Sequence, residues 1–116
     1  MRRIATHFFG VEQGSNILFS DYKDGGAMWT GDGPRELRRL VEFDEAFVNV
    51  PVVQVSISMW DMDAKANQRA DISAEMITPD GFVIVFRTWG DTRVARIRAD
   101  WVAFGEARGE EDWDVL

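Results

Sequence analysis

Cysteine is absent from this 116-residue chain, which excludes a disulfide framework, a thiolate metal site and a cysteine nucleophile. Long apolar runs are absent too, and none approaches the roughly 20 residues that a membrane-spanning helix needs. The amino end carries two arginines but no apolar stretch of signal-peptide length, so no export signal is expected. We therefore expect no membrane insertion, while an extracellular or particle-associated location stays compatible with the sequence.

Positive charge is scarce as well. The net charge of −7 argues against a nucleic-acid partner, because binding to phosphates requires a basic surface. The local exception is an arginine group near the carboxyl end, formed by Arg87, Arg93, Arg96 and Arg98. On a strand, such a group is typical of ion pairs across a sheet or between subunits.

Groups suited to catalysis or metal binding are also few. The single histidine, His7, lies in the least patterned part of the chain, and no motif predicts a serine nucleophile or a phosphate loop. Asp61, Asp63 and Asn67 offer oxygen atoms that calcium could use, but Lys65 lies among them and no bidentate acid completes the set. The sequence therefore predicts no enzyme, no metal and no cofactor.

What the chain does contain is alternation of apolar and polar residues with a period of two, which indicates half-buried strands. Residues 51–60 and 69–76 both alternate in this way. The apolar face of the second stretch consists of Ala70, Ile72, Ala74 and Met76. Residues 82–89 begin apolar on both faces, as in a central strand, and a Pro-Asp-Gly turn precedes them.

Residues 93–104 alternate again, so the stretch 51–105 is predicted to form an antiparallel meander. Further strands are expected at 16–20 and at about 38–43, where alternation outweighs a helical start. The loop 21–33 between them is long enough to be functional. We predict an all-β fold, a six-stranded antiparallel β-sandwich at residues 14–105, with an N-terminal extension at 1–13 and an acidic C-terminal tail at 106–116.

Polar and aromatic residues at the predicted strand ends suit a sugar ligand. Asp32 lies in the long loop, Arg69 begins a strand, and Trp89 ends one. A carboxylate and a guanidinium can share vicinal hydroxyls through charge-assisted hydrogen bonds, while an indole covers the apolar face of a pyranose. A purely structural interpretation is also open: Arg69 could pair with Asp32 or Asp61 to hold a loop, and Trp89 could belong to the core.

The order of several short motifs is similar to that of the H-type lectin domain, which is found in snail agglutinins and at the carboxyl end of the slime-mould discoidins. The resemblance covers roughly residues 14–105 and is to a short, bacterial-like form of the domain. The motifs are Asp32-x-x-Arg35-Glu36-Leu37, Phe43, Pro51-Val52-Val53, Ser56-Ile57-Ser58, Asp61, Asn67-Gln68-Arg69, Ile77-Thr78-x-x-Gly81-Phe82, Thr88-Trp89, Asp91-Thr92 and Trp101-x-Ala103.

This resemblance implies a homotrimer that binds galactose or N-acetylgalactosamine at the seams between subunits, as a non-enzymatic lectin in cell adhesion. By similarity, Asp32 with its neighbour Gly31, together with Arg69, would bind the sugar hydroxyls. Trp89 and the following Gly90 would be offered by the adjacent subunit. Pairing of two trimers into a hexamer is compatible with the same resemblance.

The chain departs from the snail agglutinins at two positions. Gly90 stands where they have a histidine, and Ala95 aligns with an aromatic residue that helps to enclose the sugar. The site could therefore be more open or prefer another sugar, and Arg93 and Arg96 nearby would favour an acidic or sulfated glycan. The alternative hypothesis is a structural or adaptor trimer that keeps the lectin fold without a working sugar site.

Overall fold

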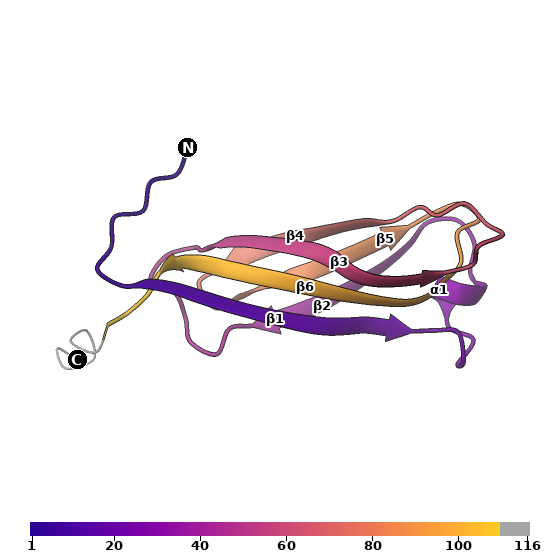
Figure 1. Ribbon diagram of the computed structural model, residues 1–116, viewed down its shortest axis with the longest axis horizontal. Helices are drawn as coiled ribbons and strands as arrows, with labels where there is room; N and C mark the ends of the chain where they lie inside the picture. The colour runs from indigo at the N-terminus through magenta and orange to yellow at the C-terminus, as the bar shows by residue number, and fades with distance from the viewer. Residues whose placement is uncertain (110–116) are drawn as a thin grey trace.

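The structure, a computed structural model that describes residues 1–109, is a β-sandwich of two three-stranded antiparallel sheets (Figure 1). Its elements are β1 (Phe9–Ser20), a single helical turn α1 (Ala27–Thr30), β2 (Arg35–Glu42), β3 (Val52–Met62), β4 (Asp71–Thr78), β5 (Gly81–Thr88) and β6 (Val94–Glu106). The strand orders are β1-β6-β3 and β2-β5-β4. The predicted all-β sandwich is confirmed, and no helix in residues 1–109 is long and apolar enough to cross a membrane.

The predicted meander is wrong. β4 and β5 pair with each other across a tight turn, but β3 pairs with β6, and β5 also pairs with β2. Segments 63–70 and 89–93 therefore cross from one sheet to the other instead of linking neighbouring strands. Alternation identifies which residues face inward, and both sheets of a sandwich satisfy it equally well.

The core lies between the sheets, and β5 and β6 supply most of it. Phe82, Ile84, Phe86 and Ile97 are at most 1% exposed. Trp101 of β6 packs edge-on against Phe82 of β5, with ring centroids 5.3 Å apart, which joins the two sheets. β5 is the middle strand of its sheet and is buried along most of its length, which confirms the prediction of a central strand.

One predicted inward residue in β4 faces outward. Met76 is 71% exposed, although the sequence pattern places it on the apolar face. The pairing of β4 with β5 shifts register between Glu75 and Thr78, and Met76 has a φ of 51°. This bulge turns Met76 to the surface and packs Ile77 against the core in its place.

β1 is longer than the strand predicted at 16–20, because it begins at Phe9 and pairs with β6 along most of its length. Its alternation is inverted, since Val11 and Ile17 are 62% and 55% exposed. On its inner face Gly14 lies so close to Trp101 that a Cβ there would be 2.6 Å from the ring. Because small residues of this strand face inward and apolar residues face outward, a search for apolar residues at inward positions does not detect it.

Two members of the arginine group, Arg87 and Arg96, form ion pairs across a sheet, as the pattern indicated. Arg87 of β5 donates to Glu36 of β2 at 2.9 Å and to Glu75 of β4 at 3.0 Å. A hydrogen bond from Ser73, followed by that from Arg87, lowers the pKa of Glu75. These pairs are partly exposed, so each contributes little stability on its own.

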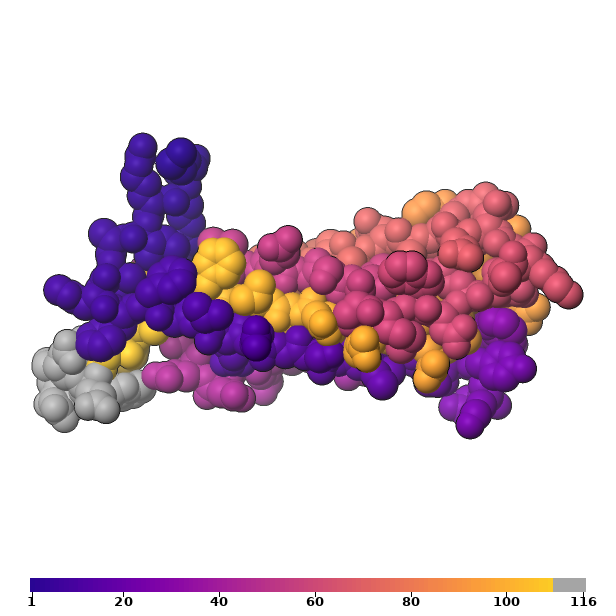
Figure 2. Space-filling view, in the orientation of Figure 1, coloured from indigo at the N-terminus to yellow at the C-terminus, as the bar shows by residue number. Residues whose placement is uncertain are grey.

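The amino-terminal segment and the end of β6 lie at one end of the sandwich, while α1 lies at the other (Figure 1). The segments around α1 and around residues 60–70 form this second end in the space-filling view (Figure 2). We call it the loop end, made of loops 21–34, 63–70 and 89–93. The residues predicted to bind sugar all lie in these loops.

Candidate functional site

Three backbone segments meet at the loop end around Gly90. Its carbonyl accepts a hydrogen bond from the N–H of Gly33 at 3.0 Å and one from the guanidinium of Arg35 at 3.3 Å. Arg35 also donates to the Gly33 carbonyl at 2.9 Å. These bonds hold the segment that contains Asp32 against the turn that contains Trp89.

Arg69 is fixed through both its backbone and its side chain. Its N–H donates to the Thr92 hydroxyl at 3.0 Å, and its carbonyl accepts from the Thr88 hydroxyl at 2.6 Å. Its guanidinium forms an ion pair with Asp91, and the Thr92 hydroxyl donates to the Asn67 carbonyl. Both threonines are buried, so the loop 67–69 is anchored on the crossing between β5 and β6.

The ion pair lowers the pKa of Asp91. The hydrogen bond from Arg69 is the main cause; desolvation opposes it, and hydrogen bonds from Asn67 add to the lowering. A carboxylate that stays ionised holds the guanidinium in one place at neutral and mildly acidic pH.

Gly90 allows the close approach of this guanidinium. Its φ of +68° lies in the left-handed region, and a Cβ there would be 3.1 Å from Nη1 of Arg69. A larger residue at this position would be strained and would press on the guanidinium. The glycine at position 90, where the snail agglutinins have a histidine, therefore permits the observed placement of Arg69.

Neither purely structural interpretation of the predicted site agrees with the structure. Arg69 pairs with Asp91 and not with Asp32 or Asp61, and Trp89 is 44% exposed and so is not a core residue. Asp32 is exposed, and its carboxylate has no hydrogen-bond or ion-pair partner among residues 1–109. The three loops are brought together, while the carboxylate and the indole remain open to solvent.

A family model described as the H-type lectin domain matches residues 38–104. The chain belongs to the H-type lectin family. A discoidin-1 polypeptide from Dictyostelium discoideum is 36% identical over 81 residues, which are 69% of this chain but only 32% of the discoidin. This H-type lectin chain thus spans about a third of that relative.

Two further similar proteins are a solved structure and a relative of nearly the same length. The solved structure of wild-type discoidin II from Dictyostelium discoideum has a TM-score of 0.75 at 25% identity, over 90% of the lectin chain and 40% of that chain. A protein of Fuscovulum blasticum described as ATP synthase subunits region ORF 7 is 64% identical over 106 residues, which are 91% of this chain and 92% of the relative.

Sequence reasoning missed the residues that hold this site in the H-type lectin chain. Asp91, Thr92 and Arg35 all appear in the family-like motifs, yet none of them was expected to hold Arg69 or Gly90 in place. Their partners lie 22, 23 and 55 positions away in the chain, at Arg69 and Gly90. Spacing along a sequence gives no signal for such contacts, so only the family-like order of motifs pointed to these residues.

The arginines expected to refill the site have other partners. Arg93 lies over the ring of Trp29, with its guanidinium carbon 4.4 Å from the ring centroid, and pairs with Asp63 at 3.6 Å. Arg96 pairs with Asp61 at 3.5 Å. Within residues 1–109 no group of three acidic or histidine side chains could hold a metal ion.

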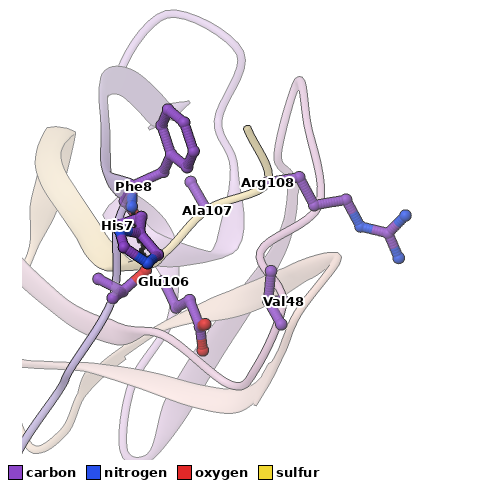
Figure 3. Close-up of a pocket in the computed structure, with 7 residues that line it drawn as sticks. His7, Phe8, Val48, Glu106, Ala107 and Arg108 are labelled. Atoms are coloured by element: carbon purple, nitrogen blue, oxygen red, sulfur yellow. Dashed lines mark hydrogen bonds between the residues drawn. The ribbon is translucent and has the colours of Figure 1, made fainter. Parts of the chain in front are cut away.

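His7 lies at the end opposite the loop end, where it lines an open cavity of about 340 Å³ with Glu106 and Arg108 (Figure 3). The Glu106 carboxylate accepts a hydrogen bond from the side-chain amide of Asn49 at 2.8 Å. The hydroxyl of Thr6, which also lines the cavity, donates to the Phe8 carbonyl at 2.9 Å. Thr6 and Glu106, two polar residues that line this cavity with His7, therefore both have hydrogen-bond partners within residues 1–109.

We expect Asp91→Asn to loosen the loop 67–69, because Arg69 loses its ionic partner. Amide hydrogen exchange at Arg69 should become about fivefold faster, as for a partly exposed ion pair. In the wild-type chain the pKa of Asp91 lies below its ordinary 3.8, so the contribution of the pair is present above that pH and is lost as the pH falls through the lowered value. Asp71→Asn, which removes a similar exposed partner of Arg87, is the control; equal exchange at Arg69 in all three proteins would contradict the anchoring role.

Proposed function

We propose that this H-type lectin chain is a non-enzymatic carbohydrate-binding module for sugars of the galactose and N-acetylgalactosamine type. The supporting observation is the convergence at Gly90, where backbone bonds hold the loop of Asp32 beside Arg69 and the turn of Trp89. The carboxylate and the guanidinium bind vicinal hydroxyls, and the indole covers the apolar face of the ring. A Cβ at Gly31 would lie 2.2 Å from the carbonyl oxygen of Ala27, and one at Gly90 would lie 3.1 Å from Nη1 of Arg69, so both glycines allow the loops to pack closely.

We further propose that the module works as a homotrimer with the sugar at the subunit seams, where Trp89 of one subunit faces Asp32 and Arg69 of the next. Strands β1 and β3 of the sheet β1-β6-β3 expose large apolar residues, and exposed apolar patches mark protein interfaces. These residues are Phe9, Val11, Ile17 and Trp60, each 55–62% exposed. A shallow site binds weakly, and three copies gain avidity for cell-surface glycans, as in adhesion, without new contacts.

Arg98→Glu is expected to dissociate the trimer at micromolar concentration. Arg98 of β6 donates to the hydroxyl of Ser58 at 3.0 Å and lies near Asp100 on the outer face of the sheet. Glutamate would place a second carboxylate beside Asp100 in a contact between subunits, where like charges repel. Sedimentation velocity checks this, with Arg38→Glu on the outer face of the other sheet as the matched control; an intact trimer in the Arg98 variant would contradict this interface.

Calorimetric titration of the purified chain with N-acetylgalactosamine tests the proposed function. Saturable heat at millimolar or lower sugar supports the lectin. No heat from a folded trimer would favour the second candidate, a structural or adaptor trimer. Gly90 and the buried Ala95 support that candidate, because they lack the contact surface that the snail agglutinins have at these positions.

A further inference from the structure

A separate cavity of about 420 Å³ opens at the loop end, between loop 21–33 and the adjoining ends of β3 and β6. This volume lies within the range of about 300–1,000 Å³ that is typical of small-ligand sites. None of its lining residues is Asp32, Arg69 or Trp89, although Ala95, which aligns with an aromatic residue that encloses the sugar in the snail agglutinins, is among them. Its walls are of two kinds, an aromatic wall and a charged rim.

The aromatic wall consists of Tyr22 and Trp29, whose rings meet edge to face with centroids 4.9 Å apart. Trp29 is held in place, because the guanidinium of Arg93 lies over its ring and donates to its carbonyl at 2.9 Å. Arg93 is held in turn by Asp63. The aromatic surface is therefore formed before any ligand binds, which lowers the cost of binding.

Ala95 keeps the cavity open. It lines the cavity, is 5% exposed, and is tied to the loop because its carbonyl accepts the N–H of Asp21 at 2.7 Å. The carboxylate of Asp21 also accepts the N–H of Met28 at 3.0 Å, which fixes the start of α1. An aromatic side chain at position 95 would occupy this space. With alanine at this position, the space is a cavity lined by the aromatic pair Tyr22 and Trp29.

Of the charged residues that line the cavity, two are cations and one is an anion. Arg96 and Asp61 face each other at 3.5 Å and are both about half exposed, so they balance one another. Lys23 also lines the cavity, and its ammonium group has no ion-pair partner among residues 1–109. A cationic rim on a chain with a net charge of −7 points to an anionic ligand.

We propose that this cavity binds an anionic pyranoside, a sugar ring that carries a carboxylate or a sulfate group. The apolar face of the ring packs on Trp29 and Tyr22, and the anion pairs with Lys23 and with the guanidinium of Arg96. The carboxylate of Asp61 accepts hydrogen bonds from the ring hydroxyls. This second site contains none of Asp32, Arg69 and Trp89 and gives the loop end a further specificity.

The test is calorimetric titration of the full chain with methyl β-glucuronide and galactose 6-sulfate, with methyl β-glucoside as the neutral probe. We expect the better of the two anionic sugars to bind at least about tenfold more tightly than the glucoside, since it gains charge-assisted hydrogen bonds. Added salt should weaken this binding, because the charges involved are exposed. The comparison of carboxylate with sulfate identifies the preferred anion.

Lys23→Gln should remove the preference for the anion, whereas Lys65→Gln, the same change at the other lysine of the chain, should retain it. Asp32→Ala should also retain it, which separates this site from the neutral-sugar site. Equal affinity for charged and neutral sugars, no binding at millimolar concentration, or an equal loss in both lysine variants would overturn the proposal.

Discussion

Asp32→Ala is expected to abolish binding of N-acetylgalactosamine while leaving the β-sandwich folded. The Asp32 carboxylate is exposed and has no partner among residues 1–109, so its removal breaks no contact within that part of the chain. Two charge-assisted hydrogen bonds to the sugar would be lost, which corresponds to a decrease in affinity of about a hundredfold or more. Calorimetry measures the affinity, and circular dichroism and sedimentation report on the fold and the assembly.

Asp44→Ala is the matched control for this variant. Asp44 is also exposed, but it follows β2 at the end of the sandwich opposite the loop end, beside the turn between β4 and β5. The Asp44→Ala variant should bind sugar as tightly as the wild-type chain does. Unchanged sugar binding by the Asp32 variant, or an equal loss in both variants, would be incompatible with the proposed site.

Phe86→Ala is expected to produce the largest loss of stability, about 3–5 kcal/mol, because it leaves a cavity between the two sheets. Phe86 is fully buried in the middle strand β5, and its ring packs against Phe19 of β1 with centroids 5.5 Å apart. Urea denaturation followed by tryptophan fluorescence measures the free energy of unfolding.

Val83→Ala provides the comparison within the same strand. Val83 is only half-buried and lies on the outer side of β5, so its truncation should cost about 1 kcal/mol or less. If the two variants lost the same stability, the core could not lie where the structure has it. A loss below about 1 kcal/mol in the Phe86 variant would lead to the same conclusion.

Strands could be predicted from the sequence wherever burial imposes a regular pattern. β6 was predicted because Ala95, Ile97 and Ala99 alternate with more polar residues, and β5 was predicted because its first residues are apolar on both faces. The outward turn of Met76 could not be predicted, because a bulge inserts one residue and breaks the alternation. β1 was predicted only in part, because Gly14 leaves room for Trp101 and so carries no apolar side chain inward.

Residue chemistry and the family-like order of motifs together indicated Asp32, Arg69 and Trp89 as a candidate site. The structure adds what holds them, which is the ion pair of Arg69 with Asp91 and the hydrogen bonds to Gly90. These contacts join loops that are far apart in the sequence and brought close only by the packing of two sheets. Pairing between sheets depends on the whole fold, so local spacing could not reveal it.

The cavity beside Trp29 and the open site around Gly90 both lie at the loop end and are proposed to bind an anionic sugar and a neutral sugar, respectively. Trp89 lies at the crossing from β5 to β6 and Arg69 at the crossing from β3 to β4, while Trp29 and Lys23 lie on the loop after β1. A glycan with a neutral sugar and an acidic sugar could occupy both places within one protomer or across neighbouring protomers. The gain in affinity would come from linkage of two weak contacts.

Nuclear magnetic resonance of the ¹⁵N-labelled chain shows whether sugar binds around Gly90. On titration with N-acetylgalactosamine, we expect the amide signals of Gly31, Gly33, Arg69 and Gly90 and the indole signal of Trp89 to shift and saturate together. Signals of the turn between β4 and β5, at the opposite end, should stay in place. Shifts confined to other residues, or no shifts at millimolar sugar, would contradict sugar binding around Gly90.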